Sequence, residues 1–123
     1  MNKAISIKKK INNFTKTISV DGDKSLSIRW ALMASQAEGT SRAYNLLSSE
    51  DVRSTLKCLK TLGIKSSFKK NYCEIKGNGI NGFKYKKNLV LNAGNSGTLG
   101  RLILALLIRS KNKIKLIGDD SLS

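Results

Sequence analysis

The stretch Asn92–Arg101 (NAGNSGTLGR) decides how this chain folds, because a glycine- and hydroxyl-rich turn here opens an apolar helix. Asp21–Arg29 (DGDKSLSIR) has the same plan. Exposed N–H groups and the positive end of the helix dipole make the start of such a helix attractive to anions. Lys24, Arg29 and Arg101 add formal charge. Two such turns in one short chain predict a small ligand that carries phosphate.

Each turn also has a simpler explanation. A glycine-rich turn before a helix is often only a cap, and the Gly-Lys-Ser/Thr of a nucleotide-binding P-loop is missing. Lys24 is compatible with a solvated turn, and Arg29 with an ion pair to Glu38 or Asp51. The coincidence of two caps, each with its own arginine, favours a binding site.

The net charge of +15 indicates an anionic partner. A basic nucleic-acid-binding module is therefore one alternative, but only five of the 23 basic residues are arginine and the lysines are spread along the chain. Compositional bias explains such an excess equally well. Because the basic residues are spread out and few are arginine, we expect no nucleic-acid partner. We also expect no membrane partner, because the longest aliphatic run, Leu102–Ile108, is too short to span a bilayer.

The reactive side chains limit the chemistry. The chain has no histidine, which excludes a Ser-His or Cys-His nucleophile built within it. Cys58 and Cys73 lack the spacing of metal ligands, and we expect both to be buried thiols, one in a helix and one in a strand. We expect no metal ion, no cofactor and a reducing, cytoplasmic location.

Apolar periodicity and turn residues predict three helices and five strands. The expected helices are residues 25–38, 51–62 and 97–108, and the expected strands are 41–47, 64–68, 72–76, 89–91 and 114–117. The pattern restarts after roughly 70 residues, as a repeated unit would. The sequence thus predicts an α/β (α+β) fold with an extended segment at 1–20, one βαβαββ-like unit at 21–88 and an incomplete second unit at 89–123, as the front of a longer protein.

Four motifs in order resemble those of 5-enolpyruvylshikimate-3-phosphate synthases. Asp21–Arg29 resembles the family's P-G-D-K-S-x-S-x-R signature, and Leu47–Val52 resembles L-x-S-x-D-V. Asn92–Leu102 is similar to its G-N-[AS]-G-T-x-x-R-L box, and Gly118–Ser123 to the opening of G-D-x-S-L-x-x-R-P-M. The resemblance covers nearly the whole chain and is weakest over residues 1–20.

The resemblance implies an enzyme that transfers the enolpyruvyl group of phosphoenolpyruvate to the 5-hydroxyl of shikimate 3-phosphate and releases phosphate, in aromatic amino-acid biosynthesis. It implies two globular halves, each of three βαβαββ units, with the active site in the cleft between them. The complete protein would be a monomer, and residues 1–20 would pack on the second half.

Site residues follow from the same resemblance. Lys24 would contact both substrates, Ser25 and Arg29 would hold shikimate 3-phosphate, and the backbone N–H of Gly97 would line the phosphoenolpyruvate pocket. Glyphosate mimics phosphoenolpyruvate in this family, and alanine at the position of Gly97 blocks it, so the glycine implies sensitivity. The supporting positions are Asn95, Thr98 and Arg101.

The chain departs from the family pattern in two places. Asp21 replaces the family's proline, and Ser123 precedes the expected arginine-proline pair. The family's acid/base carboxylates lie in later sequence, so we expect no catalytic residue in this stretch and no catalysis by it alone. The sister enzyme acting on UDP-N-acetylglucosamine is a further alternative, but it has lysine-asparagine where Lys24 and Ser25 stand.

Overall fold

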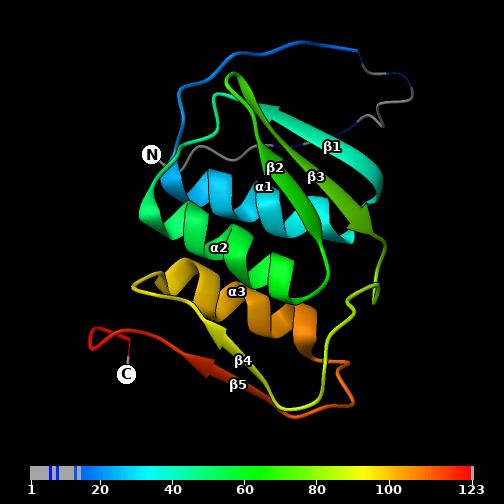
Figure 1. Ribbon diagram of the computed structural model, residues 1–123. Helices are drawn as coiled ribbons and strands as arrows, with labels where there is room; N and C mark the ends of the chain where they lie inside the picture. Colours follow the sequence, from blue (N-terminus) through cyan, green and yellow to red (C-terminus); the bar gives the residue numbers. More distant parts are fainter. Residues whose placement is uncertain (1–5, 7, 9–12, 14, 123) are drawn as a thin grey trace.

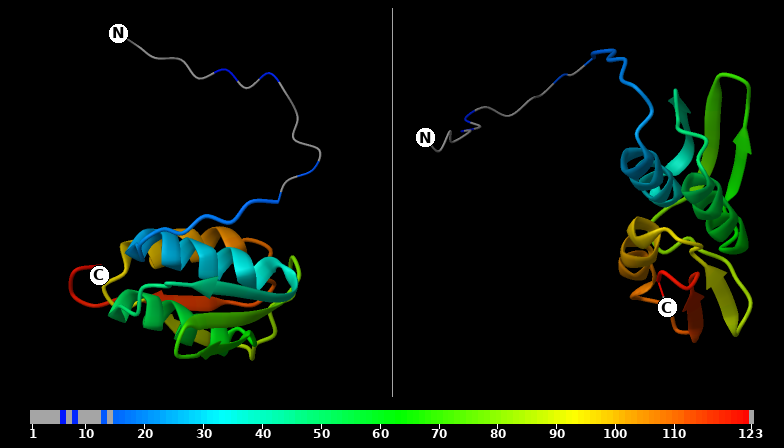
Figure 2. Two further views of the ribbon diagram at one scale, coloured as in Figure 1. Left: turned by 90° about the horizontal axis from the view of Figure 1, so that it is seen from above. Right: turned by 90° about the vertical axis from the view of Figure 1, so that its left-hand side faces the viewer.

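Three parallel helices form the centre of the molecule. The computed structural model describes residues 6, 8, 13 and 15–122, and in these α1 is Lys24–Gln36, α2 is Glu50–Thr61 and α3 is Gly97–Leu107. All three begin at the same end of the molecule, on the left in Figure 1. Viewed from that side, the N-terminal ends of the helices face the reader together (Figure 2, right).

Two small sheets flank the helices. β1 (Glu38–Tyr44), β3 (Tyr72–Asn78) and β2 (Lys65–Phe68) form an antiparallel sheet in the order β1-β3-β2. β4 (Leu89–Asn92) and β5 (Ile114–Ile117) pair in parallel, with α3 as the crossover between them. These features confirm the predicted mixed α/β class.

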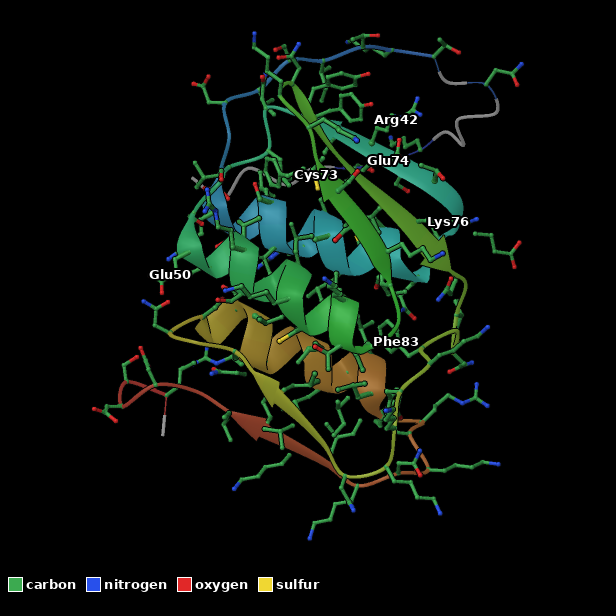
Figure 3. The ribbon with its side chains drawn as sticks, in the orientation of Figure 1. Arg42, Glu50, Cys73, Glu74, Lys76 and Phe83 are labelled. Carbon is green, nitrogen blue, oxygen red and sulfur yellow. The ribbon has the colours of Figure 1, made fainter. Side chains whose placement is uncertain are left out.

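The core lies where the helices meet the inner faces of the strands. Ile28 of α1, Leu59 of α2, Ile75 of β3 and Ile103 of α3 are all inaccessible to solvent. Cys58 in α2 and Cys73 in β3 are free buried thiols, which confirms the sequence prediction. On the outer face of the sheet, Arg42 Nε donates to Glu74 Oε2 at 2.7 Å, and Glu74 raises the pKa of Arg42 (Figure 3).

The element boundaries differ from the prediction mainly between α1 and β1. The helix ends at Gln36, and the next strand covers 38–44 instead of the expected 41–47. Asn45 ends this strand because its φ of 58° is left-handed, a conformation that asparagine tolerates and a regular strand does not. Residues 15–23, which precede α1, form no strand.

Exposed basic residues gather at the end of the molecule opposite the helix N-termini. They lie on the segment between β3 and β4 and on the segment from the end of α3 into β5 (Figure 1). No acidic residue occurs in the sequence between Glu74 and Asp119. The residues of this basic end are Lys84, Lys86, Lys87, Arg109, Lys111, Lys113 and Lys115.

Candidate anion-binding site

The first predicted turn forms a capped helix start that is tied to the end of β1. Asp23 has extended backbone angles, and its Oδ1 accepts from the Leu26 N–H at 2.7 Å. The buried Ser27 Oγ accepts from the Leu47 N–H at 3.1 Å. A Cβ at Gly22 would lie 2.6 Å from the Asn45 carbonyl oxygen, so the close approach of these two segments requires glycine.

The second predicted turn is fixed at the start of α3. Ser96 is buried, and its Oγ accepts from the Leu99 N–H at 3.2 Å. Asn92 Oδ1 accepts from the Gly94 N–H at 2.8 Å, closing the turn after β4. The Asp119 N–H donates to the Gly94 carbonyl at 2.9 Å, which brings the segment after β5 against the turn.

The first turn of α2 connects the two predicted turns. Lys24 Nζ lies 3.2 Å from Asp51 Oδ2, which joins the start of α1 to that of α2. A Cβ built on Gly94 would lie 3.3 Å from Ser54 Oγ, so the α3 turn lies against the same part of α2. Three helix N-termini therefore converge, and their dipoles favour negative charge there.

The structure places the predicted site residues in two neighbouring groups. Lys24 is exposed and Ser25 is half-buried at the start of α1, with Arg29 exposed one turn later. A groove of about 430 Å³ brings Gly97 and Arg101 together with Gly118, Ser121 and Leu122. Around it Gly97 and Thr98 are half-buried and Asn95 is exposed.

Arg29 takes a place that the sequence did not indicate. It lines a different, largely apolar groove of about 580 Å³ between α1 and α3, together with Leu32, Met33 and Leu102. In the described part of the chain it forms an ion pair with neither Glu38 nor Asp51, because the partner of Asp51 is Lys24. Arg29 therefore lies beside the apolar groove and apart from the Lys24–Asp51 ion pair.

Sequence reasoning missed Asp51 and Ser54 as residues of this end of the molecule. Asp51 belongs to the Leu47–Val52 motif, whose role stayed unassigned. No sequence pattern marked Ser54 as a residue of this end, because its proximity to Gly94 depends on the packing of α2 beside the turn. Among the described residues, no three potential metal-ligating side chains cluster. None of the helices in the described ranges has the length and apolarity needed to cross a membrane.

Parallel helices that present their N-termini together, beside one antiparallel sheet and one parallel strand pair, agree with the enolpyruvyl transferase fold. Its similarity to the structure described as EPSP synthase from Acinetobacter baumannii has a TM-score of 0.72 at 36% identity, over 86% of this chain and 24% of that one. The family model described as EPSP synthase (3-phosphoshikimate 1-carboxyvinyltransferase) matches residues 8–123. The chain belongs to the EPSP synthase family.

Curated relatives agree with this membership. The chain is 40% identical over 107 residues to a 3-phosphoshikimate 1-carboxyvinyltransferase of Streptococcus mutans, covering 87% of this chain and 25% of that protein. It is also 40% identical over 119 residues to the protein of the same name from Thermoanaerobacter sp., covering 96% of this chain and 27% of the relative. The chain thus spans about a quarter of the length of the curated relatives it matches.

Proposed function

We propose that this chain is part of an enzyme that transfers the enolpyruvyl group of phosphoenolpyruvate to shikimate 3-phosphate. The C5 hydroxyl oxygen of the acceptor bonds to C2 of phosphoenolpyruvate, the C2–O bond to phosphate breaks, and in the net reaction the hydroxyl proton leaves with the phosphate. The observation that carries this proposal is the convergence of both predicted anion-binding turns at one end of a family member. Both substrates are polyanions, so positioning and electrostatic stabilisation are the tasks of the protein.

The site residues keep the roles that the family pattern gives them. Lys24 contacts both substrates, Ser25 and Arg29 hold shikimate 3-phosphate, and the Gly97 N–H faces phosphoenolpyruvate. The half-buried position of Gly97 beside the groove and the exposure of Lys24 and Arg29 support these assignments. Asn95, Thr98 and Arg101 support the turn around Gly97.

The remaining assignments follow from the same proposal. Residues 21–88 form the first repeat unit and 89–123 begin the second. The expected packing of residues 1–20 on the other half of the complete protein falls largely outside the described residues. That protein acts as a cytoplasmic monomer, and its reaction requires no nucleic acid, metal or cofactor. This chain contributes one part of the site and does not catalyse the reaction by itself.

The test is whether shikimate 3-phosphate binds saturably to the 123-residue chain. Thermal unfolding and NMR titration both measure this binding. A ligand that binds the folded state raises the unfolding midpoint with concentration. Shikimate without its phosphate controls for the cyclohexene carboxylate ring, and UDP-N-acetylglucosamine tests the sister activity. Arg29→Ala should weaken binding, whereas Lys86→Ala at the basic end should not. Equal losses from both substitutions would indicate nonspecific attraction of an anion and contradict the proposal.

A further inference from the structure

Asp51 is a buried carboxylate in the first turn of α2, and its placement has a specific consequence. The residue is 8% exposed, and a buried charge is costly without a partner. In the described part of the chain, the partner recorded for its carboxylate is the ammonium group of Lys24. One of the proposed substrate-contacting groups is thus held by a residue on a different helix.

The carboxylate is the fixed member of this pair. Ser49 caps α2 by accepting from the Val52 N–H at 3.4 Å, and the buried Thr55 Oγ1 donates to the Asp51 carbonyl at 2.9 Å. The first turn of a helix also favours an acidic side chain through its dipole. The Asp51 side chain is 11% exposed and that of Lys24 is 54% exposed, so the lysine is the member with freedom to move.

We propose that Asp51 is a positioning residue that directs the Lys24 ammonium toward the converging helix N-termini. This inference rests on the proposed function, in which Lys24 contacts the phosphate-bearing substrates. Asp51 does not touch substrate and acts through the lysine. This proposal also assigns a role to the Leu47–Val52 motif, because the capping by Ser49 and the carboxylate of Asp51 together place the Lys24 side chain.

Two opposing effects of Asp51 on anion binding allow a sharp test. Its negative charge repels a bound phosphate, whereas its hold on Lys24 preorganises the lysine and removes an ordering cost from binding. With Lys24 present, we expect the second effect to dominate. With Lys24 removed, only the repulsion is left, so the effect of replacing Asp51 should change sign.

The experiment is a double-mutant cycle with shikimate 3-phosphate as the probe. The wild-type chain is compared with Lys24→Met, Asp51→Asn and the double variant by NMR titration, which reports weak dissociation constants. We expect Asp51→Asn to weaken binding about fivefold in the Lys24 background, corresponding to the upper range for a partly exposed ion pair. In the Lys24→Met background, the same substitution should strengthen binding. Stronger binding in both backgrounds, or an equal loss in both, would overturn the proposal.

A second measurement keeps this inference separate from the proposed function. The ¹⁵N relaxation of the Lys24 ammonium should show restricted motion in the wild type and free motion in Asp51→Asn, with the exposed Lys84 as a mobile control. If the wild type fails to bind shikimate 3-phosphate, the proposed function fails for this chain, and the relaxation data still decide whether Asp51 holds Lys24. A Lys24 ammonium as mobile as that of Lys84 in the wild type would overturn the inference.

Discussion

Cys73 is enclosed by the sheet and α1, and burial raises the pKa of its thiol to about 11, from 9.0 when it is solvated (Figure 3). A pKa raised by folding contributes stability that is present below pH 9.0 and is lost as the pH rises through about 11. We therefore expect the free energy of unfolding to fall across this window. Denaturant titrations at successive pH values measure this free energy of unfolding.

Cys73→Ala provides the control for this titration. It leaves a small cavity and lowers stability at pH 7, but it has no thiol to ionise. The stability gap between wild type and variant should narrow as the pH rises above 9.0. A constant gap up to pH 11 would show that the Cys73 thiol does not titrate within this range.

Gly97 has room for a methyl group in the free protein. A Cβ there would meet only Leu122 Cδ2, at 3.7 Å. Gly97→Ala should therefore keep the fold and raise the free energy of unfolding by up to about 1 kcal/mol, because alanine favours a helix. In a complete enzyme with this sequence, the same methyl group should weaken inhibition by glyphosate. Unchanged inhibition would contradict the role given to Gly97.

The residues of the site were predictable to different degrees. Local glycine and hydroxyl patterns predicted the helix starts at Lys24 and Gly97, whereas the substrate roles proposed for these two residues rest on the family resemblance. The sequence also suggested Arg29 as a partner for Asp51, which is wrong, since Lys24 occupies that position. Which cation reaches Asp51 depends on the packing angle between α1 and α2, and no local pattern encodes that angle.

At the scale of single elements, α1 combines a stabilising cap with an unfavourable charge. Asp23 accepts from the Leu26 N–H, but its carboxylate lies at the proposed phosphate end. Asp23→Ala should lower the free energy of unfolding by about 1 kcal/mol through loss of the cap. Asp23→Asn keeps a capping oxygen, so it should retain stability and bind shikimate 3-phosphate more tightly.

Thermal unfolding and titration of both variants separate these effects. In the thermal unfolding measurements alone, Ser49→Ala removes the corresponding cap of α2 and provides a matched control for lost capping without a change in charge. If Asp23→Asn binds no more tightly than the wild type, the anion does not approach the start of α1, and the placement of the site is wrong.

Element prediction succeeded where a single strong signal determined the element. The apolar positions of α2 and the Lys69–Asn71 turn between β2 and β3 gave bounds close to those observed. The α1–β1 junction was shifted because Gly39 suggested a helix stop, whereas Gly39 lies within β1 with a φ of 89°. Tertiary pairing of β1 with β3 overrides that local signal.

At the scale of the whole molecule, the groove between α1 and α3 leaves apolar surface uncovered. Met33 is 74% exposed and Ile80 is 80% exposed, and both line this groove. We expect the isolated chain to associate weakly as its concentration rises, because contiguous exposed apolar surface favours contact between molecules. Sedimentation velocity across a concentration series measures this association.

Met33→Lys should reduce the association, since it places a charge on the groove and the side chain already lies mostly in solvent. Lys111→Gln, at the basic end, is the control and should not reduce it. If Met33→Lys associates as strongly as the wild type, another surface is responsible.

The fold class and the order of helices and strands were within reach of the sequence, because apolar periodicity and turn spacing are visible along the chain. The convergence of three helix N-termini could not be predicted from the sequence, because it depends on the packing of α2 between the two turns. The parallel pairing of β4 with β5 could not be predicted either, because it depends on how α3 packs as the crossover between the two strands.

The concentration of exposed lysine and arginine at the basic end has a practical consequence for purification. Such a surface adsorbs cellular RNA and DNA by releasing their counterions, and this adsorption weakens steeply with salt. Protein isolated in dilute buffer should carry an absorbance shoulder at 260 nm, and the ribose phosphates of the contaminant would compete in ligand titrations. A high-salt wash on a cation exchanger, followed by a check of the 260/280 ratio, is the appropriate first step before any affinity is measured.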